Sequence, residues 1–219
     1  MHIPDGYLGP KTFIPLWTAS IALWILSFKK IRKKAGTEAL ALTGIFAAFS
    51  FVVQMFNIPL PGGTTAHIIG AGATAIVLGP YLSYIAISVV LVLQAILFAD
   101  GGITAIGANA FNMGFLFAFI SWGIFSLFKN LSERWKIIGA FLAGYAGICA
   151  SAIATAIELG IQPILETSDA GNPLYSPFPL KIAIPAMMVP HILVIGIIEG
   201  IFTVLVVKYF KKNFPELLK

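Results

Sequence analysis

The chain has 219 residues, of which 58% are hydrophobic and only 11% are charged. Soluble domains carry about 25% charged residues, so a soluble protein of this length could not cover its surface, and we expect an integral membrane protein. The single cysteine, Cys149, excludes an internal disulfide, and the net charge of +5 does not require a nucleic-acid partner, because membrane topology explains its distribution.

Residues 1–11 are polar and rich in turn formers. They do not resemble a signal peptide, because no basic region precedes the first apolar run and a basic cluster follows it instead of a cleavage site. We therefore expect Met1 to remain the terminus of the mature chain.

Hydrophobic runs then predict a single all-α domain, 1–219, with about seven transmembrane segments. They are expected at 12–28, 38–56, 65–78, 81–99, 106–128, 137–159 and 182–207. The run 65–78 is below the ~20 residues of a full span, so we expect a tilted or half-buried helix there. The Pro/Gly-rich backbone before it is expected to be irregular and to line a cavity.

Basic residues predict the orientation. If the loops are numbered alternately, one side holds two lysines, Lys11 and Lys181, and the other holds the remaining twelve lysines and arginines. The loops alternate between the two sides of the membrane in this way only if the segment 65–78 is counted as one crossing. We therefore predict an outside N-terminus and a cytoplasmic C-terminus, which places His2 and the loop before His67 on the same outer side.

The first two residues have metal-binding chemistry available. The amine of Met1, the peptide nitrogen of His2 and Nδ1 of its imidazole can chelate one ion in fused rings. Deprotonated peptide nitrogen suits metals that accept square-planar nitrogen ligation, Ni(II) or Cu(II). His67 follows the Pro/Gly-rich break and is the candidate fourth ligand. The alternative is that His2 belongs to a frayed terminus.

Four stretches also carry a resemblance to a known family. They are residues 1–8 (MHIPDGYL), 59–64 (PLPGGT) followed by His67, 94–102 (QAILFADGG) and 107–114 (GANAFNMG). They resemble the substrate-specific (S) component of energy-coupling-factor nickel/cobalt importers, the nickel/cobalt transport membrane protein family.

The resemblance implies a multi-pass protein of the prokaryotic inner (plasma) membrane that binds Ni(II), or alternatively Co(II), as its transported substrate. It also implies a membrane coupling protein and ATPase subunits as partners, with a small accessory membrane subunit as a further candidate. The chain has no P-loop motif, so ATP hydrolysis is expected on a separate subunit. Amide ligation and the Irving–Williams order favour Ni(II) over Co(II), although Cu(II) would bind such a site more tightly still.

Polar residues at membrane depth are the candidates for groups that orient these ligands. They are Gln94, Asp100, Asn109 and Asn112; helix–helix hydrogen bonding and end capping are the alternative roles. Asp5 is expected to close the N-terminal turn. Glu158 and Glu199 have no partner that the sequence identifies, and we interpret His191 as a packing or hydrogen-bonding residue.

Small residues recur every four positions in 139–155, which predicts close packing inside the bundle, and again at Ala35 and Ala39. The resemblance implies that the second stripe faces the coupling protein. Other classes are less favoured: an intramembrane metalloenzyme would need a water position that a saturated square-planar site lacks, and the chain has neither a His-Glu-x-x-His motif nor a Gly-x-Ser-x-Gly elbow. A secondary transporter would want more intramembrane charges or an inverted repeat.

Overall fold

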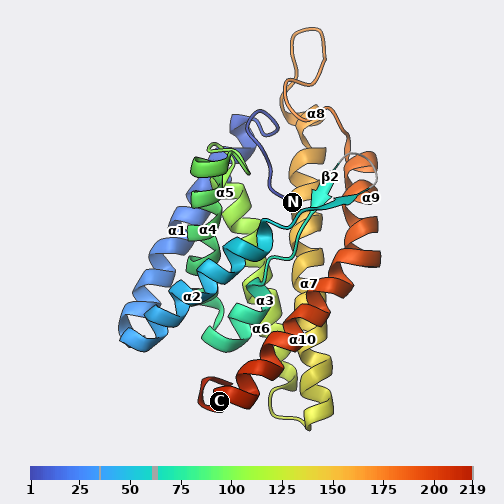
Figure 1. The fold of residues 1–219 in the computed structure, drawn as a ribbon. Helices are drawn as coiled ribbons and strands as arrows, with labels where there is room; N and C mark the ends of the chain where they lie inside the picture. The colour runs from blue at the N-terminus through green and yellow to red at the C-terminus, as the bar shows by residue number, and fades with distance from the viewer. Residues whose placement is uncertain (35, 61–63, 219) are drawn as a thin grey trace.

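The computed structural model describes residues 1–34, 36–60 and 64–218 as a bundle of helices (Figure 1). Six helical stretches in this part of the chain are long and apolar enough to cross a membrane. They are α1 (Pro10–Lys34), α2 (Thr37–Gln54), α4 (Pro80–Phe98), α5–η1–α6 (Ile106–Asn109, Ala110–Leu116, Phe117–Phe128), α7–α8 (Glu133–Gly160, Gln162–Leu165) and α9–η2–α10 (Leu180–Pro190, His191–Ile195, Gly196–Asn213). The predicted all-α membrane bundle is confirmed.

The short segment predicted at 65–78 differs in detail from its prediction. A two-stranded hairpin, β1 (Ile58–Leu60) and β2 (Thr64–Ala66), pairs Ile58 with Ala66 where irregular backbone was expected. Residues 67–70 then lead into α3 (Ala71–Leu78), which has eight residues, seven of them buried. Such a helix is about 12 Å long and cannot cross a ~30 Å hydrocarbon layer alone, so its neighbours cover it instead.

The two ends of the bundle gather different loops. At one end the start of α1 meets the α7–α9 connection, where the Lys11 ammonium donates to the Leu165 carbonyl oxygen at 2.8 Å. At the opposite end Lys211 of α10 pairs with Glu133 at the start of α7. The end of α1 and the chain's C-terminus, with the short η3 (Pro215–Leu218), lie at this second end (Figure 1). The basic loops therefore share one end of the molecule.

α7 lies against α6, α9 and α10 and forms the central support of the bundle. Its small residues face inward: a Cβ added at Gly147 would lie 2.2 Å from Cδ2 of Phe117, which shows that α6 approaches the α7 backbone directly. Close approach of this kind is the packing that the small-residue stripe predicts. Ala39 lies half-buried on α2, and Ala35 lies outside the described residues.

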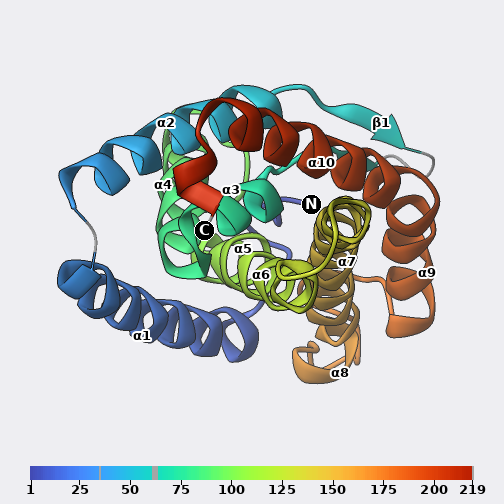
Figure 2. The ribbon, with the colours of Figure 1, turned by 90° about the horizontal axis from the view of Figure 1, so that it is seen from below.

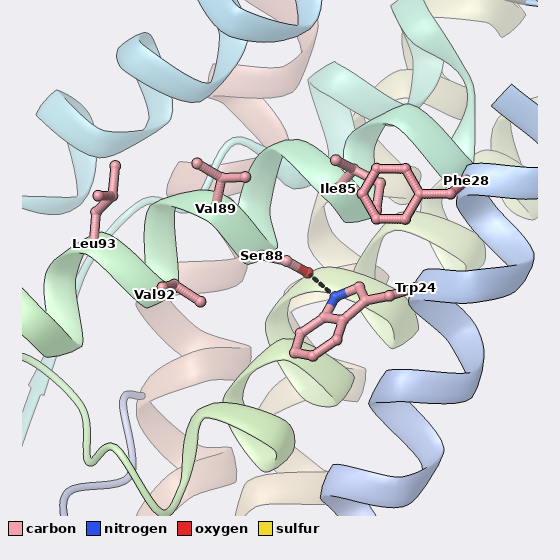
Figure 3. Close-up of a pocket in the computed structure, with 7 residues that line it drawn as sticks. All are labelled: Trp24, Phe28, Ile85, Ser88, Val89, Val92 and Leu93. Atoms are coloured by element: carbon pink, nitrogen blue, oxygen red, sulfur yellow. Dashed lines mark hydrogen bonds between the residues drawn. The ribbon is translucent and has the colours of Figure 1, made fainter. Parts of the chain in front are cut away.

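Large apolar side chains, among them Phe28, Leu97 and Leu205, cover the outside, as a hydrocarbon solvent requires. A groove of about 280 Å³ runs between α1 and α4 (Figure 3). Its polar atoms are satisfied internally, since the indole N–H of Trp24 donates to Ser88 Oγ at 2.8 Å (Figure 3). This groove presents hydrocarbon surface, and the polar chemistry lies deeper in the bundle.

Candidate metal centre

The N-terminal segment enters the bundle instead of extending into solvent. It descends from the start of α1 to the middle of the helices, and the N-terminus lies inside their ring in both ribbon views (Figures 1 and 2). Met1, Ile3 and Leu8 are buried. Met1 packs in the same apolar cluster as Tyr84 and Ile195. The burial of alternate apolar residues explains why a Pro/Gly-rich segment docks at all.

Asn109 pairs with the peptide groups of Ile3 like the edge of a β-strand. Its Oδ1 accepts from the Ile3 N–H at 2.9 Å, and its Nδ2 donates to the Ile3 carbonyl oxygen at 3.1 Å. The backbone N–H of Gly102 donates to the same carbonyl oxygen at 2.8 Å. Asn109 therefore fixes the peptide next to His2 through two hydrogen bonds to Ile3.

Asp5 binds the loop before α5 and does not close its own turn, so that expectation was wrong. Its carboxylate accepts from the N–H groups of Ile103 (3.0 Å) and Thr104 (2.9 Å) and from the Thr104 hydroxyl. The loop approaches so closely that a Cβ at Gly102 would lie 2.3 Å from the Asp5 nitrogen. Only glycine leaves room for the segment at this position.

His2 and His67 meet inside the bundle. His67 follows β2 and is 2% exposed. The two rings stack with centroids 4.7 Å apart and planes inclined by 23°. Nδ1 of His2 lies 3.2 Å from Nε2 of His67 and also 3.2 Å from Oδ1 of Asp100.

The outer nitrogens of both rings have acceptors of their own. Nε2 of His2 lies 3.1 Å from Gln94 Oε1, and Nδ1 of His67 lies 3.3 Å from the Ile68 carbonyl oxygen. Those oxygens only accept, so these two nitrogens carry the ring hydrogens. The lone pairs of the other two nitrogens and an Asp100 oxygen then converge. A cation beside the two imidazole nitrogens would satisfy both lone pairs.

Burial favours the unprotonated form of the Met1 amine and of the His2 and His67 imidazoles, in which each nitrogen can bind a metal. It lowers the pKa of the Met1 amine from 8.0 to about 6, although the Asp100 carboxylate opposes the shift. Burial also lowers the pKa of His2 and brings that of His67 well below its usual value of 6.5, with the Met1 amine, His2 and His191 adding to the effect on His67. Contact with the His2 imidazole lowers the pKa of Asp100. Near pH 7 the site therefore has neutral nitrogens beside one carboxylate.

Side chains alone do not complete a metal site. Among the described residues, no group of three or more His, Cys, Asp or Glu side chains is arranged to hold an ion. An ion bound by His2 and His67 would need further donors, and the Met1 amine and the His2 peptide nitrogen are the candidates that the sequence predicts. The amine of Met1 is therefore a further candidate ligand.

Two other polar residues make contacts away from the imidazole pair: Asn112 takes the helix–helix role that was the alternative for it, and Glu199 takes a role that the sequence analysis missed. Asn112 faces α7, where its Nδ2 donates to Glu158 Oε2 at 2.8 Å and to Thr155 Oγ1 at 3.2 Å. The carboxylate of Glu199, fully buried on α10, accepts from the N–H groups of Ile69 and Gly70 at 2.8 and 2.9 Å and so holds the peptide after His67. Charge inside an apolar span was the only sequence signal for Glu199.

Comparison with known proteins agrees with this architecture. The model of the family described as cobalt uptake substrate-specific transmembrane region matches residues 2–217. A fused nickel transport protein of Rhodobacter capsulatus is 44% identical over 100% of this chain, which spans 64% of that protein's length. A cobalt transport protein of Lachnoclostridium phytofermentans is 34% identical over 94% of this chain and 80% of its own.

A solved structure agrees equally well. The crystal structure of a truncated transition metal transporter superposes with a TM-score of 0.92 at 45% identity, covering 97% of this chain and 99% of its own. Sequence and fold thus agree over nearly the whole chain, from the docked segment to α10. The chain belongs to the family of cobalt uptake substrate-specific transmembrane regions.

Proposed function

We propose that this single-domain chain is the substrate-binding membrane component of an ATP-driven energy-coupling-factor importer, with Ni(II) as its transported substrate. The observation that supports the proposal most directly is the convergence of His2 Nδ1 and His67 Nε2 at 3.2 Å beside the buried Met1. The ion would be held by the amine of Met1, the amide nitrogen and Nδ1 of His2, and Nε2 of His67.

The separation of the two imidazole nitrogens supports a square-planar arrangement. In a fused chelate the amide nitrogen is central, so the amine and Nδ1 are opposite each other and His67 is opposite the amide. His67 Nε2 is then adjacent to His2 Nδ1. Two adjacent ligands at about 2.0–2.1 Å from one ion lie about 2.8–3.0 Å apart, close to the observed 3.2 Å. Opposite ligands would lie about 4 Å apart.

Charge balance also supports the proposal. Ni(II) brings two positive charges, and the deprotonated amide and the Asp100 carboxylate bring one negative charge each. The loaded centre is therefore neutral overall, which limits the cost of burying it. Gln94 would orient the His2 ring through Nε2, Asp100 would lie beside the metal as a counter-charge, and Asn109 would hold the peptide beside His2.

Nickel is preferred over cobalt because displacement of an amide proton favours metals that accept strong in-plane nitrogen donors. The names of similar proteins include both metals, with nickel at 44% identity and cobalt at 34%. Co(II) is the competing substrate, and a competition titration with Ni(II), Co(II) and Cu(II) orders the three.

The basic end of the bundle is proposed to face the cytoplasm of a prokaryotic cell, by the positive-inside rule. The coupling protein would contact α2 near Ala39 and Ala35, and ATP would be hydrolysed on separate subunits. The metal site would then open from the other side, where residues 161–181 cover the start of α1.

Calorimetric titration of the purified full chain with Ni(II) tests the site. One added residue before Met1 turns the amine into an amide and should abolish tight binding, and proteolytic removal of that residue should restore it. His2→Ala should also abolish it, whereas Tyr7→Ala, an exposed position in the same segment, should not. Undiminished affinity in the extended chain would falsify the amine-ligand model.

A further inference from the structure

His191 is the third imidazole of the chain, and its environment differs from that of an ordinary packing residue. It begins η2, directly after Pro190, and is 1% exposed. Its backbone N–H donates to the Met188 carbonyl oxygen, and its Nδ1 lies 2.6 Å from the Met187 carbonyl oxygen. A carbonyl only accepts, so Nδ1 carries the ring hydrogen and Nε2 carries the lone pair.

That lone pair is buried without a hydrogen-bond partner among the described residues. Leaving a buried acceptor unsatisfied is costly, and native structures rarely do so without a functional reason. One ring nitrogen fixed by a carbonyl oxygen, with the other presented as a lone pair, is the usual state of a metal-binding histidine. His67 has the same arrangement with the Ile68 carbonyl oxygen.

His191 also lies near the proposed chelate. Met187, whose carbonyl oxygen contacts the His191 imidazole, and Cys149, whose thiol contacts the His191 carbonyl oxygen, both pack against the apolar cluster that contains Met1. The Met1 side chain shares an apolar cluster with Ile195 of η2, against which Met187 packs. Helical side chains lean toward the N-terminal end of their helix, and α9 begins at the end of the bundle from which the N-terminal segment enters (Figure 1).

We propose that Nε2 of His191 is a second metal-binding nitrogen, which takes the ion when it leaves the Met1–His2–His67 chelate. This rests on the proposed function. In the transfer all four bonds between the metal and the chelate nitrogens break; the amide nitrogen of His2 regains a proton from a water molecule, whose hydroxide leaves with the ion as its counter-charge, and the other three nitrogens keep their lone pairs. The lone pair of Nε2 forms the new bond and releases no proton, because the ring hydrogen stays on Nδ1.

A magnetic resonance experiment tests the metal contact directly. The chain has three histidines, so in the His2→Ala/His67→Ala variant every imidazole signal comes from His191. With nitrogen-15-labelled histidine in the full-length variant, the Nε2 resonance should shift or broaden on addition of Ni(II), and the Nδ1 resonance should keep its hydrogen-bonded position. An Nε2 signal that is unchanged up to about 1 mM Ni(II) would overturn the proposal.

Uptake measurements with the complete importer test the role in transport. His191→Asn keeps an N–H donor in the place of Nδ1 but removes Nε2, and His191→Gln removes Nδ1 and places an amide near Nε2. Both should lower nickel uptake about 10-fold or more while equilibrium affinity at the chelate changes little. His191→Cys restores a metal donor without the shape of imidazole and should recover part of the uptake.

Each outcome separates the two proposals. Equal loss of uptake in the Asn, Gln and Cys variants would assign His191 a structural role and overturn the inference. Uptake that is unchanged in the Asn variant would overturn it as well. A different result would contradict the proposed function: the His2→Ala variant would bind nickel as tightly as the wild-type chain.

Discussion

Replacing Gly102 by alanine should displace the N-terminal segment while leaving every proposed ligand in the chain. The added Cβ would lie 2.3 Å from the Asp5 nitrogen and 2.7 Å from the Pro4 carbonyl carbon, where ordinary contact begins at 3.4 Å. The segment must therefore move by about 1 Å, twice the tolerance of a preorganised site. The Gly102–Ile3 hydrogen bond, now 2.8 Å, would lengthen to about 3.8 Å and be lost.

The expected loss follows from those bonds. The bond from Gly102 and the nearby pairing of Ile3 with Asn109 contribute about 1 kcal/mol each, so nickel binding should weaken by about 2 kcal/mol, or about 30-fold in Kd. Calorimetric titration measures the change. Gly123→Ala, at a glycine with open space around it, is the matched control. Wild-type nickel affinity in the Gly102→Ala protein would refute the role of the docked segment.

Four further predictions concern the ligands, the partner face and the orientation. Gln94→Leu removes the acceptor that holds the His2 tautomer and should weaken nickel binding about 10- to 100-fold in the same titration. Affinity should fall more steeply with decreasing pH below about 6 than above it, because the amine, whose pKa burial lowers to about 6, becomes protonated there; equal slopes in buffer-dependent calorimetry would contradict this. Ala39→Trp should leave nickel binding unchanged but reduce co-purification with the coupling protein. Normal co-purification would show that the small residues Ala35 and Ala39 serve packing inside the bundle instead. Cysteines introduced at Asp169 and Lys212 in a background without the native cysteine should be labelled from outside and inside respectively, and the reverse pattern would exclude the proposed orientation.

Local pattern was sufficient for the helices but not for the contacts that build the site. Apolar runs and basic clusters predicted the spans, because hydrocarbon solvent imposes length and composition on each span separately. The hairpin before His67 was missed because it depends on three-residue strands at the edge of a Pro/Gly-rich loop. Asn109 was predicted to support the ligands, but its pairing with the Ile3 backbone, 106 residues away, has no local signature.

The local sequence around Asp5 likewise did not identify its long-range hydrogen-bond partners. An aspartate between a proline and a glycine, Pro4-Asp5-Gly6, indicates a local turn, and the turn is present. Its carboxylate instead binds two N–H groups before α5, because those donors would otherwise lack partners and the docked segment brings the carboxylate within reach. The sequence does not show whether the Asp5 carboxylate lies nearer to the N–H groups of its own turn or to those before α5, whereas the fold does.

The Glu199 carboxylate gives the bundle a mechanical property. It joins α10, whose far end carries the basic C-terminal tail, to the peptide groups that follow His67. These two hydrogen bonds contribute about 1–3 kcal/mol together, so we expect a small displacement of α10 to carry those peptide groups along. We therefore expect a push on the basic end of α10 to be transmitted through Glu199 to the peptide groups that follow His67 in the interior of the bundle.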